Sequence, residues 1–197
     1  MTSRAETWGV PLLLALLIFF FFLGILVTNR YVIPWDAMSY YYPMTFFLVE
    51  NLKQFSVPLW NPHIFAGLPS VADPQVSTFY PSKWLLALLS ASSPLSYKLY
   101  EGELLFHHFL AGLFMFRFLR SLGLLGFSSL TGAFTFMFSG ALVARAQHHT
   151  IVLAMAWVPL LFMYVRLAIV NASVPSAVKA GLILGLQFLA GHPQTSV

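Results

Sequence analysis

The sequence predicts an all-α integral membrane protein: a polytopic helix bundle with about five transmembrane helices and further interfacial helices in its first outer loop. Three observations support this prediction. The chain of 197 residues is 59% hydrophobic and 8% charged, whereas soluble domains carry about 25% charged residues. Five apolar runs approach the length of about 20 residues that a helix needs to cross a bilayer. The ten basic residues are scattered singly, mostly near the ends of these runs, which excludes the basic patch of a nucleic-acid-binding surface.

The first apolar run covers residues 10–27 and follows Arg4. It is longer than the core of a typical secretory signal peptide, and no small-residue cleavage site follows it. We therefore expect a retained signal-anchor helix whose N-terminus stays in the cytoplasm.

Residues 28–102 are rich in proline and aromatic residues and are predicted to form a long extracytoplasmic loop. Apolar residues recur at helical spacing in MTFFLVENLKQF, which predicts an interfacial helix with one buried face. That face consists of Met44, Phe47, Leu48, Leu52 and Phe55. Pro43 suits the first turn of this helix, and Tyr42, which precedes the proline, is expected to be extended. The stretch KWLLALL, from Lys83, predicts a second short helix.

Residues 103–197 are predicted to form a four-helix transmembrane part, so that residues 1–197 make a single transmembrane domain. The expected spans are residues 104–119, 124–143, 151–170 and 174–190. Pro159 is expected to kink the third of these spans, and Ser128, Gly132 and Gly140 are expected at helix–helix contacts. The last span ends close to Val197 with no polar tail, which predicts a chain truncated at its C-terminus.

The basic residues predict the orientation of the chain, because cytoplasmic segments of membrane proteins carry an excess of lysine and arginine. With the N-terminus inside, the cytoplasmic basic residues are Arg4, Arg117, Arg120, Arg166 and Lys179. Residues 28–102, the turn RAQHHT and the C-terminal GHPQTSV then lie outside, and Arg145 is the main exception to the rule. The sequence thus predicts a multi-pass protein of the plasma membrane whose long first loop is extracytoplasmic.

This topology gathers titratable side chains at one face of the membrane. They are Asp36, His63, Asp73, Glu101, Glu103, His107, His108, Arg145, His148, His149 and His192. Each has an ordinary structural explanation: Asp36 could cap a helix or pair with Arg30, and the aromatic residues match a membrane-interface belt. The chain has no cysteine, which excludes a thiolate nucleophile and a cysteine metal site. The residues themselves favour an outward-facing site of carboxylates and histidines and go no further.

A series of short polar motifs runs through nearly the whole chain after the first helix. The series is WDAMSYYYP, VPLWNPHIFAGLPSVADPQVSTFYPSKWLL, MFRFLRSLGL, FTFMFSGALVARAQHHTIVLAMAWVPL and LQFLAGHPQT. In this order the motifs resemble the bacterial YfhO-like membrane protein family, whose members are much longer and have more helices. The resemblance implies the fold of the C-type glycosyltransferases, which transfer a sugar from a polyprenyl-phosphate carrier on the outer face. It also implies a cell-envelope polymer, such as a teichoic acid, as the acceptor.

The resemblance further implies a site. Asp36 holds the place of the catalytic or metal-binding acid in the first outer loop, although Trp35 stands where a small residue or glycine is usual. Sugar transfer needs a carboxylate base for the acceptor hydroxyl, and cations for the leaving phosphate. Asp73 is the expected second acid. The expected substrate-binding residues are Tyr40, Tyr41, Trp60, His63, Arg145, His148, His149, His192 and Gln194.

Within this expected site, Arg145, His148 or His149 would stabilise the phosphate, and His192 would complete the rim. The tyrosines and Trp60 would stack on sugar faces. Whether the site uses a Mg²⁺ or Mn²⁺ ion with Asp36 as a ligand stays open, because two separated aspartates are too few to define a metal site.

Two other functions stay open. A transporter or flippase of a lipid-linked or small polar substrate would have inverted repeats and ionisable residues near the bilayer midplane, whereas the polar residues of this chain gather toward one face. In a non-catalytic scaffold of an envelope-assembly complex, the loop motifs would be structural and Asp36 replaceable. The identities of the sugar and of the acceptor are open as well.

Overall fold

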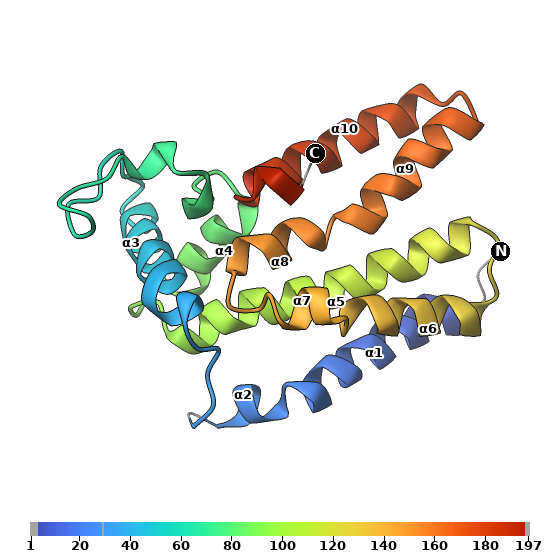
Figure 1. Ribbon diagram of the computed structural model, residues 1–197, viewed down its shortest axis with the longest axis horizontal. Helices are drawn as coiled ribbons and strands as arrows, with labels where there is room; N and C mark the ends of the chain where they lie inside the picture. Colours follow the sequence, from blue (N-terminus) through green and yellow to red (C-terminus); the bar gives the residue numbers. More distant parts are fainter. Residues whose placement is uncertain (1–3, 29, 196–197) are drawn as a thin grey trace.

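The computed structural model describes residues 4–28 and 30–195, which form helices joined by turns and one long loop (Figure 1). Up to residue 90 these are α1 (Arg4–Phe21), α2 (Leu23–Val27), the π-helix η1 (Ala37–Tyr41), α3 (Tyr42–Leu52), the 3₁₀ turns η2 (Ser70–Ala72) and η3 (Pro74–Val76), and α4 (Pro81–Leu89). They continue with α5 (Tyr97–Ser121), α6 (Gly126–Met137), α7 (Gly140–Val143), α8 (His149–Met155), α9 (Val158–Val170), α10 (Val174–Leu189) and η4 (Pro193–Thr195). No β-strand occurs within residues 4–28 and 30–195, where an isolated bridge pairs Asn61 with Leu68. The predicted all-α class is confirmed.

The long helices lie side by side along the longest axis of the molecule, and α3, α4 and the loop between them cover one end (Figure 1). The central helix is α5, which packs against α1, α4, α6, α8 and α9. The turns from α5 to α6 and from α9 to α10 lie at the opposite end (Figure 1). The turns at which the chain reverses direction therefore separate into two groups, one at each end of the bundle (Figure 1).

Within the residues that the structure describes, two helical segments are long and apolar enough to cross a membrane, Gly126–Val143 and His149–Val170. The apolar part of α1, Gly9–Phe21, and α10 are shorter. Large apolar side chains are also exposed on the outside of the bundle. They include Phe20, Phe127, Ile169 and Leu182. An exposed apolar surface of this kind is typical of a protein covered by lipid or by a partner. These features agree with a membrane protein, while the five-span bundle stays a prediction.

Three of the predicted spans are interrupted. The first breaks at Phe22, whose φ of −101° and ψ of 19° leave the helical region. The second interruption separates α6 from α7 at Ser139, whose side chain accepts a hydrogen bond from the Leu142 amide at 3.4 Å. The third separates α8 from α9 just before Pro159, which lacks the N–H that a continuous helix needs. The expected effect of Pro159 is confirmed, and the other two breaks have no counterpart in the sequence prediction.

Both helices predicted in the first loop are present, as α3 and α4. Met44, Leu48 and Leu52 are buried, as the predicted face requires, but Phe55 lies beyond the end of α3 and is 94% exposed. The extended conformation expected for Tyr42 is wrong, because its φ of −66° and ψ of −48° are helical. The cause is η1, which runs directly into α3.

Small residues bring α6 close to α5. A Cβ at Gly132 would overlap the side chain of Leu119, so the contact expected there is confirmed. A Cβ at Gly140 would meet no atom within 4 Å, and Ser128 is exposed, so neither of these residues makes the expected contact. Ser129 is the buried serine of this helix.

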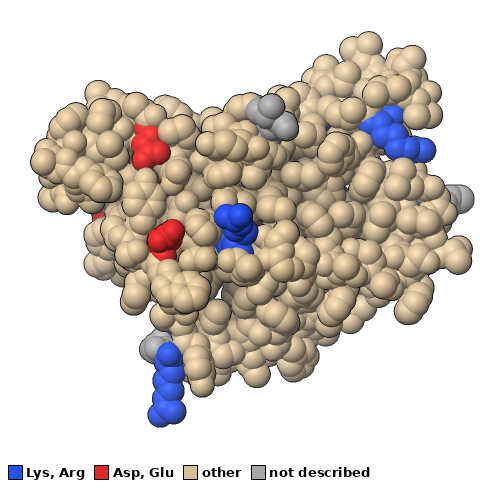
Figure 2. Space-filling view, in the orientation of Figure 1, with Lys and Arg blue, Asp and Glu red and all other residues tan. Residues whose placement is uncertain are grey.

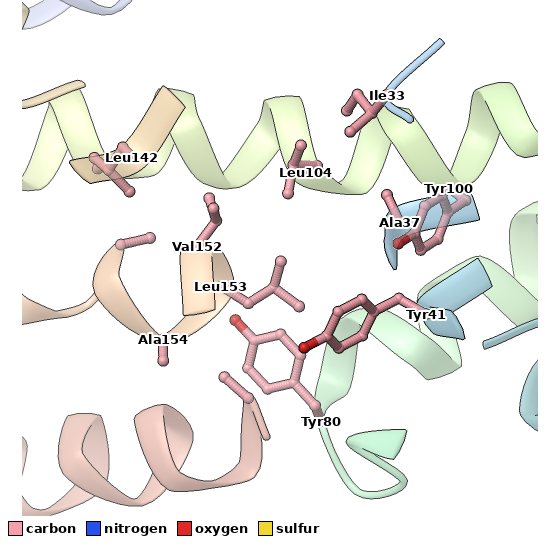
Figure 3. Packing of buried hydrophobic residues seen from close by; sticks show 13 residues of the cluster. Ile33, Ala37, Tyr41, Tyr80, Tyr100, Leu104, Leu142, Val152, Leu153 and Ala154 are labelled. Carbon is pink, nitrogen blue, oxygen red and sulfur yellow. The ribbon is translucent and has the colours of Figure 1, made fainter. Parts of the chain in front are cut away.

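One of the buried hydrophobic clusters lies where the first loop meets the bundle (Figure 3), and another lies between α1, α5 and α6. Tyr41 of η1, Tyr80, Tyr100 of α5 and Leu153 of α8 meet there and are each at most 6% exposed. Buried aromatic side chains each remove about 150–250 Å² of surface from water. The first loop is therefore held to the bundle mainly by apolar burial.

Candidate functional site

A group of polar side chains lies at the α3 end of the bundle, and we call it the outer cluster. Its members are Asp36, Tyr40, Asp73, Arg145, His148 and His192. Asp36 comes directly before η1, and its side chain makes no capping hydrogen bond. Its Oδ2 lies 3.5 Å from His148 Nε2, and the two side chains are 55% and 27% exposed. The partner of Asp36 is thus His148 rather than Arg30, and its carboxylate stays accessible to solvent.

Asp73 is held by two hydrogen bonds. Its Oδ1 accepts from the Gln75 amide at 2.9 Å, which caps η3, and its Oδ2 accepts from the Tyr40 hydroxyl at 3.1 Å. Burial and the negative charge of Asp73 raise the pKa of Tyr40 to about 12. The phenol is therefore protonated at neutral pH and donates to Asp73. This bond ties the loop of Asp73 to the helix that follows Asp36.

Gly191 brings the end of α10 against the segment that follows Asp73. Its φ is +96°, and a Cβ at this position would lie 2.5 Å from the Pro74 carbonyl oxygen and would overlap the Ser77 hydroxyl. Ser77 Oγ donates a hydrogen bond to the Ala190 carbonyl at 2.9 Å. The motifs ADPQ and AGHPQ, far apart in the sequence, are therefore in contact.

His192 and Arg145 place further cationic groups beside the pair of Asp36 and His148. Burial lowers the pKa of His192, and the positive charges of Arg145 and His148 lower it further, so the three side chains lie within electrostatic range. Arg145 is exposed, and within the part of the chain that the structure describes its guanidinium has no hydrogen-bond or ion-pair partner. Figure 2 shows acidic and basic side chains near one another on a face that otherwise carries few charges.

The outer cluster therefore combines two chemical functions. The exposed Asp36 carboxylate can accept a proton from a bound hydroxyl group. Arg145 can bind a phosphate with two parallel hydrogen bonds, and the neighbouring histidines can add donors.

Two of the predicted substrate-binding residues lie in the interior instead. Tyr41 is 6% exposed and belongs to the core cluster shown in Figure 3. His149 is 1% exposed. Neither side chain has the free surface to contact a sugar or a phosphate at the rim, which corrects the roles expected for both.

Three other predicted residues are exposed in separate places. The Trp60 ring covers Gly67 within the long loop. The His63 ring meets Phe47 edge-on, with ring centroids 5.6 Å apart. Gln194 is exposed in η4. Among the described residues, no hydrogen bond, ion pair or ring contact joins these three side chains to the outer cluster, and their roles stay predictions.

A second polar group lies inside the protein, and we call it the buried network. It consists of Ser82, Lys83, Glu103 and His149. Glu103 Oε2 accepts from Lys83 Nζ and from His149 Nε2, each at 2.8 Å, and Oε1 accepts from the Ser82 hydroxyl. Lys83, Glu103 and His149 are each at most 2% exposed in their side chains. The network joins α4, α5 and α8. Sequence reasoning missed Lys83 and Ser82, because KWLLALL does not reveal which way its lysine points.

A chain of hydrogen bonds extends this network toward α9. His107 Nδ1 lies 2.8 Å from the Glu103 carbonyl oxygen, to which it must donate. In the neutral ring Nε2 is then an acceptor, and it receives the Tyr80 hydroxyl at 2.6 Å. Trp157 Nε1 in turn donates to the Tyr80 oxygen at 2.8 Å. All of these polar atoms are satisfied by one another.

An apolar cavity of about 550 Å³ lies beside this chain of hydrogen bonds. Its walls come from α4, α5, α9 and α10 and include Leu85, Phe106, Leu110, Phe114 and Leu186. The volume falls within the range of about 300–1,000 Å³ that is usual for small-molecule sites. Its apolar lining suits a hydrocarbon rather than a sugar.

The outer cluster does not form a complete set of metal ligands. Among residues 4–28 and 30–195, no group of three or more histidine, aspartate or glutamate side chains is arranged to hold a metal ion. A Mg²⁺ or Mn²⁺ ion at Asp36 would therefore need further ligands from substrate or water.

Comparison of the chain with protein-family models, with curated proteins and with solved structures found no match.

Proposed function

We propose that this chain acts as a membrane glycosyltransferase, which moves a sugar from a polyprenyl-phosphate carrier to a cell-envelope polymer or glycan at the extracytoplasmic face. The observation that carries the proposal is the exposed Asp36 carboxylate paired with His148, with Arg145 and His192 beside it. Transfer from a lipid phosphate requires a base and a set of cations in one accessible site.

In the proposed reaction, Asp36 takes the proton of the acceptor hydroxyl while the acceptor oxygen bonds to the anomeric carbon of the sugar. The bond between that carbon and the carrier phosphate oxygen breaks, and its electrons leave with the phosphate. Arg145 and His148 stabilise the charge of the leaving phosphate, and an oxocarbenium-like transition state links the two events. Asp73, whose two oxygens already accept hydrogen bonds, positions the Tyr40 side of the cluster.

The apolar cavity supports a lipid-linked donor. A polyprenyl chain is a hydrocarbon, and the cavity lining of Leu85, Phe106 and Leu110 offers it a surface free of unsatisfied polar atoms. We assign this cavity to a segment of the carrier chain.

The proposal includes the five-span topology, with the N-terminus in the cytoplasm of a bacterial cell and α3 and α4 outside its plasma membrane. Basic side chains near the opposite end of the bundle support it. Arg120 Nη1 donates to the Leu124 carbonyl at 2.6 Å, and Arg166 Nη1 donates to the Ser121 carbonyl at 3.2 Å. Both arginines thus lie at the turn after α5, where the positive-inside rule expects cytoplasmic charge.

The test is sugar release from a panel of radiolabelled polyprenyl-phosphate sugars by the purified protein in detergent. Asp36→Asn is expected to lower turnover by about 10²–10⁴-fold, the usual contribution of a general base. Glu50→Gln is the matched control, because Glu50 is a carboxylate of the same loop that pairs with Lys53 outside the outer cluster. Unchanged turnover in folded Asp36→Asn protein would refute the role of Asp36 and favour a scaffold.

A transporter or flippase is the second candidate, and the buried network favours it. Lys83, Glu103 and His149 are ionisable groups enclosed within an apolar bundle, and such groups often mark transport pathways. Movement of a fluorescent lipid-linked sugar across vesicles containing the protein, without sugar release, would support this function.

A further inference from the structure

We propose that Glu101 and Glu103 of α5 are positioning residues that together set the separation of Asp36 and His148. Neither glutamate belongs to the outer cluster, and their side chains are 1% and 2% exposed. Each binds the chain next to one member of the pair. Residues two apart on a helix point about 200° away from each other, so α5 can hold two different segments at a fixed distance.

Glu103 holds the segment that carries His148. His149, the next residue, donates from Nε2 to Glu103 Oε2 at 2.8 Å. The His149 ring is also stacked on Tyr100 of α5, with ring centroids 4.3 Å apart and an interplanar angle of 17°. Of residues 145–149, His149 is the buried one, so this turn is anchored to α5 through its last side chain.

Backbone hydrogen bonds within this turn fix the position of His148 relative to His149. The His148 amide donates to the Arg145 carbonyl at 2.7 Å, and the Ile151 amide donates to the His148 carbonyl at 3.0 Å. With His149 directed inward to Glu103, His148 points away from the core toward Asp36.

Glu101 holds the segment that carries Asp36. Its Oε1 accepts from the Ile33 amide at 2.8 Å, three residues before Asp36. The carbonyl of Ile33 accepts from the Tyr97 hydroxyl at 2.5 Å, one helical turn earlier on α5. Lys98 Nζ lies 3.0 Å from Glu101 Oε2 and fixes the carboxylate in turn.

The segments that carry Asp36 and His148 are therefore both hydrogen-bonded to α5, although the two residues lie far apart in the sequence. Loss of either anchor should let its segment drift and lengthen the gap between Asp36 and His148. An effect of this distance on catalysis rests on the proposed function, whereas the distance between Asp36 and His148 can be tested without it.

The test measures the geometry directly and uses the absence of cysteine from the natural chain. The full chain carrying Asp36→Cys and His148→Cys is treated with a short bis-methanethiosulfonate reagent. Intact mass then separates one bridging reagent from two independent modifications. We expect mostly bridged product, because the side chains of residues 36 and 148 face each other.

Matched substitutions in the double-cysteine protein distinguish the effect of losing a hydrogen bond from the effect of changing the size of the side chain. His149→Phe keeps the ring stack but loses the bond to Glu103, whereas His149→Gln keeps an N–H donor. Glu101→Leu loses the acceptor for the Ile33 amide, whereas Glu101→Gln keeps a carbonyl oxygen there. We expect the bridged fraction to fall several-fold in the Phe and Leu variants and to stay near the parent value in both Gln variants.

Two results would overturn the proposal. The first is an unchanged bridged fraction in the Phe and Leu variants, with helix content and monodispersity retained. The second is an equal fall in all four variants, since the hydrogen bonds would then not be the cause. Should Glu101→Leu fail to fold, Glu101→Met takes its place, because it also removes the acceptor for the Ile33 amide but keeps an unbranched side chain. Loss of bridging together with unaffected sugar release in Asp36→Asn would refute the proposed function while leaving the positioning role intact.

Discussion

Removal of the Glu103 charge is the most informative perturbation of stability, because Glu103 is the partner of a lysine with 1% side-chain exposure. In Glu103→Gln the ammonium of Lys83 stays enclosed without a carboxylate. Loss of one partner of a buried ion pair costs about 3–5 kcal/mol, whereas replacement of both partners by neutral groups is often close to neutral. We therefore expect Glu103→Gln to lower the free energy of unfolding by about 3–5 kcal/mol.

The magnitude is tested by a double-mutant cycle with Lys83→Met. The double variant should recover most of the loss. The coupling free energy is the sum of the losses in the two single variants minus the loss in the double variant, so it should be at least about 2–4 kcal/mol and well above the error of such cycles. Reversible unfolding by SDS in mixed micelles, followed by circular dichroism, supplies the four free energies.

Glu50 and Lys53 form the control pair, with the same residue types and a distance of 2.6 Å but side-chain exposures of 32% and 12%. Their coupling should be about 0.2–1 kcal/mol, the value usual for accessible pairs. Equal coupling for the two pairs would refute the reasoning, since burial would then not govern the strength of the Lys83–Glu103 bond.

Three further results are expected. Gly191→Ala should destabilise the protein by about 1–3 kcal/mol, because residue 191 has a φ of +96° and a Cβ there would lie 2.5 Å from a carbonyl oxygen; thermal unfolding measures the loss, and an unchanged midpoint would contradict it. Burial and Asp73 raise the pKa of Tyr40 from 10.0 to about 12. The contribution of the protonated phenol to the free energy of unfolding is therefore complete below pH 10 and is lost as the pH rises toward 12. Unfolding free energies measured across this range should show this loss in the parent protein and not in Tyr40→Phe. Burial and Arg145 lower the pKa of His192 in the folded protein. The neutral ring therefore stabilises the fold at pH values above the pKa of His192 in the unfolded chain, and this stabilisation is lost as the pH falls. Arg145→Gln should raise the pKa of His192 in the folded protein, which histidine hydrogen–deuterium exchange can measure.

Helix periodicity and proline chemistry were sufficient for much of the fold. The apolar stripe of α3 and the interruption before Pro159 both follow from local rules that need no knowledge of partners. The end of α3 was placed too late, because Phe55 continues the apolar spacing although its φ of 55° lies outside the helix. Spacing alone does not show where the backbone leaves the helix.

In the candidate site, too, some features could be predicted from the sequence and others depend on tertiary packing. That Asp36 and His148 could meet was expected from topology, because both follow spans that end on the same side. The directions of His148 and His149 were not predictable, since neighbouring residues of one type point to different surroundings once the turn is formed. Lys83 was equally hidden: in an apolar helix, a lysine can extend outward to solvent or inward to a buried carboxylate, and the choice depends on α5.

The contact between Lys83 and Glu103 also bears on how the protein is made. The two residues are 20 positions apart, so α4 leaves the ribosome shortly before the first turns of α5. A single unpaired charge is costly in hydrocarbon, whereas a lysine and a glutamate that enter as a pair carry no net charge. In the proposed topology we expect α4 to dock on the outer end of α5 as soon as α5 has inserted, so that Lys83 neutralises the charge of Glu103 early in assembly.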